Sequence, residues 1–209
     1  MKYSAFRSRI RKLPVFSSAM LGSLVRDTAT LRVQLAQWKK KGLVSVLRKG
    51  LYVLNPEDRE AEPSRFYLAN QIFMPSYVSL ESALAYYGLI PEFVGMTTSV
   101  TVRKTSTFKN EFGTFSYRHL QPTAYSGFVS VDESAKTSFL IAAPEKAVAD
   151  FLYLNLARFH PADRAIFEKS YRFQNGRSLS ARRLRNEAGK FGGKKLRTIM
   201  DLFIQEVLR

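Results

Sequence analysis

The stretch Thr28–Leu54, TATLRVQLAQWKKKGLVSVLRKGLYVL, decides the fold of the N-terminal part of this 209-residue chain. Leu31, Leu35 and Trp38 recur at positions i, i+4 and i+7, which is the spacing of one face of an α-helix. We therefore expect a helix over residues 28–41 that packs these three side chains on the rest of the N-terminal segment.

The outward face of this expected helix is typical of a helix that enters the major groove of DNA. Thr28 is a suitable N-cap and Gly42 a suitable C-terminal stop. The outward side chains are small or amide-bearing near the start, where base edges approach, and cationic near the end, where phosphates lie. Those expected to face bases are Thr28, Thr30, Val33 and Gln37, and those expected to hold phosphates are Arg32, Lys39, Lys40 and Lys41.

A basic β-hairpin is expected directly after the helix. Residues 43–47 and 51–54 are short runs rich in β-branched and aromatic side chains, and Gly50 suits the turn between them. Arg48 and Lys49 would lie at its tip and contact the DNA backbone or the minor groove.

Two further helices are expected upstream, over residues 4–12 and 18–25, with Pro14 between them. Three helices followed by a basic hairpin are the order of a winged helix-turn-helix. We therefore interpret residues 1–56 as a winged helix-turn-helix DNA-binding domain. The alternative is a winged helix that is used only for protein contact.

The net charge favours a polyanionic partner. The chain has 33 Lys and Arg against 17 Asp and Glu, a formal charge of +16. Residues 1–60 carry +9, residues 61–160 carry no net charge and residues 161–209 carry +7. A protein this basic usually binds nucleic acid, although a membrane surface or a ribosome is also compatible. The two basic ends predict two electrostatic surfaces, or one continuous surface if the ends meet.

A second domain is expected after a polar, proline-bracketed linker at residues 57–63. Helices are predicted over residues 64–74, 79–88 and 145–155, and strands over residues 99–102, 114–120, 127–131 and 139–142. The fold class is therefore α+β, with residues 64–209 forming a mixed α/β domain with a mostly antiparallel sheet.

The end of the chain, residues 161–209, is expected to be helical and basic. One interpretation is a second DNA surface, and the equally weighted alternative is a solvated helix face. The cations concerned are Arg182, Arg183, Arg185, Lys194, Lys195 and Arg197.

Two motifs in the middle of the chain resemble the AbiEi antitoxin family. They are YVSLESAL at residues 77–84 with YGLI at 87–90, and IAAPEKA at residues 141–147 with Asp150. The N-terminal helices with the RKGLYVL hairpin at residues 48–54 add to the resemblance, which covers residues 15 to 155.

The resemblance implies an antitoxin of a type IV toxin–antitoxin system. Proteins of this family counteract a nucleotidyltransferase-like toxin in abortive infection, a form of phage resistance, and bind operator repeats to repress their own operon. The implied partners are double-stranded operator DNA and that toxin, with or without a stable complex. The alternative is a protein-interaction module that neutralises a toxin by direct contact, with Tyr77, Tyr86, Tyr87 and Phe93 as aromatic anchors.

The sequence gives little sign of an enzyme, and no cofactor or metal is expected. His119 and His160 are the only histidines and lie far apart, and no phosphate-binding or zinc-binding motif is present. Glu145 and Asp150 are five residues apart on a predicted helix, so they share a face poorly. Cysteine is absent, and no apolar run is long enough for a membrane span or a signal core, so we expect a cytoplasmic protein without a membrane partner.

Overall fold

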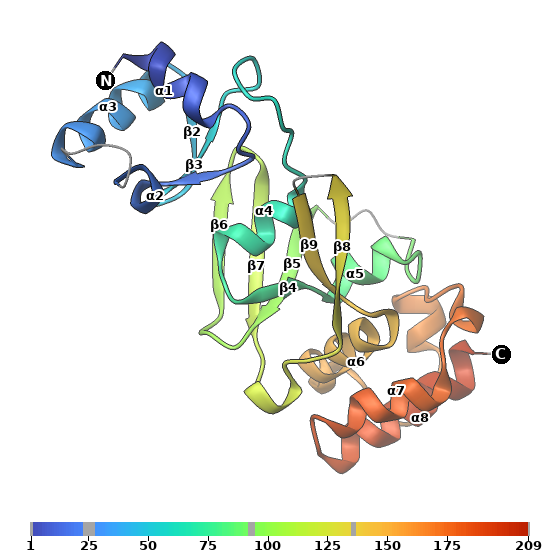
Figure 1. Ribbon diagram of the computed structural model, residues 1–209. Coiled ribbons are helices and arrows are strands. Elements are labelled where there is room, and N and C mark those ends of the chain that lie inside the picture. Colours follow the sequence, from blue (N-terminus) through green and yellow to red (C-terminus); the bar gives the residue numbers. More distant parts are fainter. Residues whose placement is uncertain (1, 23–27, 92–94, 135–136, 209) are drawn as a thin grey trace.

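The computed structural model describes residues 2–22, 28–91, 95–134 and 137–208, and it is a mixed α+β structure (Figure 1). Two hydrophobic clusters organise it. The smaller one lies in the N-terminal unit, around Phe6, Phe16 and Trp38. The larger one fills the remainder of the chain and includes Leu47 and Val53 from the N-terminal unit, so the two units share packing.

The N-terminal unit has three helices and a three-stranded antiparallel sheet in the order β1-β3-β2. Its elements are α1 (Tyr3–Ile10), β1 (Phe16–Ser17), α2 (Ser18–Gly22), α3 (Thr28–Lys40), β2 (Val44–Arg48) and β3 (Leu51–Leu54). The three helices and the hairpin lie where the sequence predicts them, although residues 23–25 of the predicted second helix lie outside the described residues. The two-residue strand β1 was not predicted.

Aromatic packing holds α1 and α3 together. The rings of Phe6 and Trp38 stack with their centroids 4.4 Å apart, and the Phe6 ring meets Phe16 edge-on at 5.5 Å. Leu31 and Leu35 are buried beside them. The predicted inner face of the third helix is therefore confirmed.

The second unit is built on a six-stranded mixed sheet in the order β6-β7-β5-β4-β9-β8. Its strands are β4 (Ser76–Val78), β5 (Met96–Thr101), β6 (Ser106–Asn110), β7 (Gly113–His119), β8 (Phe128–Ser134) and β9 (Thr137–Ala142). Pairs β4–β9 and β5–β7 are parallel, and the other three pairs are antiparallel. The prediction of a mostly antiparallel sheet is met only in part, because the unpredicted strands β4 and β6 change the pairing.

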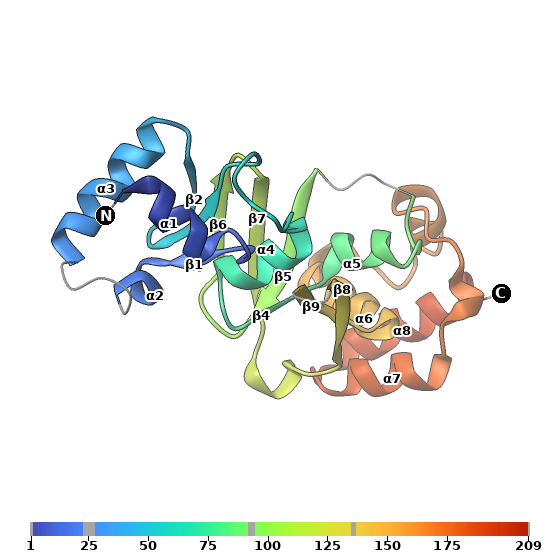
Figure 2. The ribbon, with the colours of Figure 1, turned by 45° about the horizontal axis from the view of Figure 1, so that its top comes forward.

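Helices cover both faces of this sheet (Figure 2). They are α4 (Arg65–Ile72), α5 (Leu80–Tyr86) and α6 (Pro144–Leu154). Helix α4 takes the face that carries Phe115 and Tyr117, and the Tyr117 hydroxyl donates to the Ala69 carbonyl at 2.6 Å. Helices α5 and α6 lie on the opposite face, where Tyr77 of β4 contacts α6.

The C-terminal segment packs on α6 through an amphipathic pair of helices, α7 (Ala181–Gly189) and α8 (Lys194–Val207). Ser180 caps α7 by accepting from the backbone N–H of Arg183. A π-helical turn, Ile166–Ser170, precedes them, so the segment is less regularly helical than the sequence predicts. No helix in the described ranges is both long and apolar enough to cross a bilayer.

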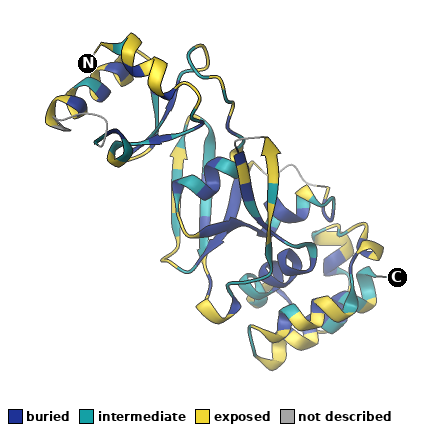
Figure 3. Ribbon diagram, in the orientation of Figure 1, coloured by how far each residue is buried: buried dark blue, intermediate teal, exposed yellow. Residues whose placement is uncertain are grey.

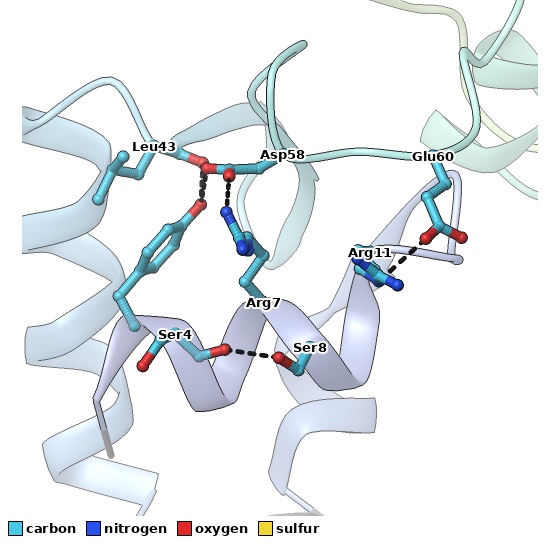
Figure 4. A network of polar contacts seen from close by, with 8 residues as sticks. Ser4, Arg7, Ser8, Arg11, Leu43, Asp58 and Glu60 are labelled. Carbon is cyan, nitrogen blue, oxygen red and sulfur yellow. Dashed lines mark hydrogen bonds and ion pairs between the residues drawn. The ribbon is translucent and has the colours of Figure 1, made fainter.

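The segment expected to be a linker is bound to α1 and its C-cap Arg11 at two positions, Asp58 and Glu60. The Asp58 carboxylate accepts from Arg7 Nη1 at 2.8 Å and from the Tyr3 hydroxyl at 2.6 Å, and Glu60 pairs with Arg11 at 2.9 Å (Figure 4). We call residues 55–63 the strap. Although burial alone would raise the pKa of Asp58, the hydrogen bonds from Tyr3 and Arg7 lower it below its ordinary value.

The substitution Asp58→Asn is expected to lower the midpoint of thermal unfolding by roughly 2–5 °C at pH 7, because it removes the charge-assisted bond to Arg7. Since the pKa of Asp58 is lower in the folded protein than in the unfolded chain, its stabilisation is complete above about pH 4. The stabilisation is lost as the pH falls through the lower, folded pKa. Thermal melts at several pH values measure the difference, and a difference that persists at pH 2 would contradict this assignment.

Candidate nucleic-acid interface

The outward face of α3 is exposed along its length, as Figure 3 shows. Val33 is 59% exposed, which is unusual for a large apolar side chain on a helix that packs its other face well. Thr30 and Gln37 are exposed on the same helix. The structure therefore brings together three of the four side chains expected to face bases. The fourth, Thr28, is the first residue of α3, and its side chain lies outside the described residues.

The cations expected to hold phosphates are all exposed, and the structure divides them between the end of α3 and the hairpin. Within the described part of the chain, none of them forms an ion pair with a carboxylate, so their charges are available to a polyanion. They are Arg32, Lys39, Lys40 and Lys41 at α3, and Arg48 and Lys49 at the hairpin turn.

The hairpin turn is fixed beside the start of α2. Gly50 has a positive φ of 82°, and its carbonyl accepts from the backbone N–H of Ser18 at 2.9 Å. A β-carbon at Gly50 would lie 3.1 Å from Ser18 Oγ, so the turn requires glycine both for its backbone angle and for space.

The second unit contributes to the same surface. Asn110, at the end of β6, donates from Nδ2 to the Leu47 carbonyl at 3.0 Å. A cleft of about 550 Å³ beside this contact is lined by three cations, Lys39, Arg48 and Lys109, and by the carboxylate residue Glu111. Sequence reasoning missed Lys109, because no local pattern links it to a hairpin 60 residues upstream.

The two basic ends lie at opposite ends of the molecule in both ribbon views (Figures 1 and 2). The interpretation of one continuous surface formed by both ends is therefore wrong. The six cations of α7 and α8 are exposed, but Arg185 is paired with Asp201 at 2.8 Å. They are Arg182, Arg183, Arg185, Lys194, Lys195 and Arg197.

The two motifs that carry the family resemblance meet in one buried network. Asp150 accepts from Lys146 Nζ at 2.6 Å, from Ser79 Oγ at 2.7 Å and from the Tyr77 hydroxyl at 3.1 Å. All four residues are fully buried. Lys146 Nζ also lies 4.3 Å from the centroid of the Phe191 ring. The network therefore joins β4, α6 and the turn between α7 and α8.

Burial sets the protonation chemistry of this network. It lowers the pKa of Lys146 and raises the pKa of Asp150, while the short hydrogen bond between them acts in the opposite direction on both. Burial also raises the pKa of Tyr77, with a further contribution from the Asp150 charge. Because all four side chains are buried, the network holds β4, α6 and the turn after α7 together. Tyr77 is for the same reason excluded as an exposed anchor for a partner.

The other carboxylate of the second motif also has a structural partner. Glu145 Oε1 accepts from the backbone N–H of Ser180 at 3.0 Å, which joins the start of α6 to the cap of α7. No group of three or more His, Cys, Asp and Glu side chains suited to a metal occurs in the described ranges.

No protein-family model matches the chain, and no curated protein matches it.

The substitution Lys146→Met is expected to lower the free energy of unfolding by about 3–5 kcal/mol, because it leaves the Asp150 carboxylate buried without its cationic partner. Chemical denaturation measures this loss. Replacing both residues, Lys146→Met with Asp150→Leu, should recover part of it. The exposed Lys194→Met is the matched control and should change stability by less than about 0.5 kcal/mol. If Lys146→Met and Lys194→Met lowered the free energy of unfolding by the same amount, the assignment would be wrong.

Proposed function

We propose that this protein is a DNA-binding transcriptional autorepressor whose N-terminal unit is a winged helix-turn-helix. The observation that carries the proposal is the exposed outward face of α3, with Val33 and Gln37 at its centre and Lys40 and Lys41 at its end. The proposal is supported by the element order of the N-terminal unit, in which β1 pairs with β3 and a short hairpin follows α3, as expected of a winged helix.

The chemistry of this face suits duplex DNA. An α-helix fits the major groove, where Gln37 can pair with the edge of adenine and Val33 can contact a thymine methyl group. The cations of α3 and of the hairpin turn then contact phosphates on either side. The exposed apolar Val33 at the centre of a cationic face fits base contact better than a generally solvated helix.

We further propose that the protein is a type IV antitoxin of the AbiEi kind, which opposes a nucleotidyltransferase-like toxin. The support is the resemblance of its two middle motifs and their meeting in the Lys146–Asp150 network, where they form one structural unit. The middle of the chain, residues 61–160, which carries no net charge, would then supply the antitoxin activity and the basic N-terminal unit the autoregulation. The cations of α7 and α8 remain either a second DNA surface or a solvated helix face.

Binding of the pure protein to its own upstream DNA and to scrambled DNA of equal length, over a salt series, tests the repressor proposal. We expect a preference of ~1000-fold or more for the upstream DNA, with a steep fall in affinity as salt rises. Equal and weak binding to both duplexes would contradict a specific operator contact.

Variants of α3 refine the same experiment. Gln37→Ala should reduce the preference between the two duplexes, because it removes a base contact. Lys40→Ala should weaken binding to both and reduce the salt slope by about one. Lys104→Ala is the control, because this exposed cation lies in the second unit. The double substitution Arg182→Gln with Arg183→Gln tests whether α7 contacts DNA. If the salt dependence of DNA affinity is unchanged in this variant, α7 is a solvated helix face.

A second candidate function is direct contact with a toxin, and one observation favours it. Tyr86 is 47% exposed and lines a hollow of about 450 Å³ with Phe66 and Phe139. Charged residues also line it: Asp132, Glu133 and Arg65. An aromatic hollow with charged neighbours suits an apolar segment of a partner that carries complementary charge. Tyr87 is half-buried, and Phe93 lies outside the described residues.

Co-expression with the product of the neighbouring gene tests this second candidate. If direct contact is the mechanism, the two proteins should co-purify, and Tyr86→Ala should weaken the complex at least tenfold because it removes a central aromatic anchor. Val129→Ala, another exposed apolar residue outside the hollow, is the control. Neutralisation of the toxin in cells without any co-purifying complex would favour the first candidate.

A further inference from the structure

A cleft of the second unit has a polar floor formed by residues of β5 and β7. In β7, Phe115 and Tyr117 point toward α4, so Thr114, Ser116 and Arg118 point to the opposite face. On that face α5 packs on β5 and α6 packs beside α5. A cleft of about 710 Å³ remains over β5 and β7, which is within the usual range of small-molecule sites.

The wall of the cleft is apolar and aromatic. Ile90 and Phe151 line it together with Tyr171, which directly follows the π-helical turn. The rings of Phe151 and Tyr171 meet edge-on with centroids 5.0 Å apart. Single π-helical turns occur frequently at functional sites. A flat apolar group of a ligand could therefore pack against this wall, opposite the floor with its hydroxyl groups.

Two arginines give the cleft a site for an anion. Arg118 is held by one hydrogen bond from Nη2 to the Leu154 carbonyl at 3.1 Å, and Arg158 lies on the turn after α6. In the described ranges, neither guanidinium has a carboxylate within ion-pair distance. Two guanidinium groups that line one cleft together with the hydroxyl-bearing residues Ser116 and Ser170 suit a phosphate group.

Glu81 is the one carboxylate among the described lining residues. Within the same ranges it forms no ion pair with either arginine. A carboxylate in a phosphate site suits the hydroxyls of a ribose or the amino group of a base, since it accepts hydrogen bonds and carries no donor.

The backbone at the cleft is strained and is held in place by the buried network. Leu80, which lines the cleft, has a φ of 58°, although it is neither glycine nor asparagine. Its neighbour Ser79 is fixed by the bond to Asp150 and by two hydrogen bonds with Thr98. Strain that the surrounding structure enforces in this way is concentrated at ligand and catalytic sites.

We propose that this cleft binds a nucleoside monophosphate or a closely similar phosphorylated ligand with a flat aromatic body. Arg118 and Arg158 hold the phosphate, Glu81 accepts from the ribose or the base, and the base lies against Phe151 and Tyr171. The cleft does not include residues of α3, so the proposal of a nucleotide site can be tested independently of DNA binding.

Isothermal titration calorimetry with AMP, GMP, CMP and UMP at about 0.15 M salt, where non-specific attraction is screened, tests the proposal. We expect at least one nucleotide to bind with a dissociation constant below about 100 μM. Adenosine and inorganic phosphate should bind at least tenfold more weakly, because each lacks one half of the recognised ligand.

Three variants make the assignment specific to the cleft. Arg158→Gln, an exposed position, should weaken nucleotide binding at least tenfold, and Ser116→Trp should abolish it by filling the floor. Lys104→Gln removes one exposed positive charge outside the cleft and should change affinity less than twofold. Circular dichroism shows whether each variant is folded.

Four results would overturn the proposal. The first is the absence of binding by all four nucleotides. The second is inorganic phosphate that binds as tightly as the nucleotides. The third is a folded Ser116→Trp variant with unchanged affinity. The fourth is a Lys104→Gln variant that loses as much affinity as Arg158→Gln.

Discussion

The buried ion pair between Lys146 and Asp150 is the contact on which the arrangement of the second unit depends. The Asp150 carboxylate accepts hydrogen bonds from Tyr77 of β4, from Ser79 and from Lys146 of α6. The Lys146 ammonium lies over the ring of Phe191, between α7 and α8. Two buried charges of this kind are tolerated only where further hydrogen bonds satisfy them, and Tyr77 and Ser79 supply these. The pair thus constrains where the central strand, the following helix and the C-terminal helices lie.

The helices of this fold could be predicted from the sequence because their signals are local. Pro144 at the start of α6 and Ser180 before α7 are recognisable without any knowledge of the tertiary structure. The strands β4 and β6 were missed for different reasons. Strand β4 has three residues and is followed at once by a helix, and β6 is a sheet edge whose polar residues give no clear alternation.

The candidate interface on α3 could also be predicted, since helical spacing alone separates Leu31 and Trp38 from Val33 and Gln37. What the sequence could not provide were relations between distant residues. Lys109 joins the surface because the end of β6 contacts the hairpin through the hydrogen bond from Asn110 to the Leu47 carbonyl. The cleft with Arg118 and Arg158 likewise combines residues of β5, β7 and α6 with residues that follow α6. The strap has the composition of a flexible linker, yet its carboxylates match the spacing of Arg7 and Arg11, one helical turn apart on α1.

The fixed strap has a consequence for avidity. A protein whose two cationic ends are joined by a flexible segment must lose orientational freedom each time both ends bind. Here Asp58 and Glu60 bind Arg7 and Arg11, so the strap is already ordered in the folded protein. If both basic ends bind one polyanion, as in the proposal of a second DNA surface, less orientational freedom would have to be lost when the second end binds. The ordered strap would then favour polyanions whose shape matches the spacing of the two ends.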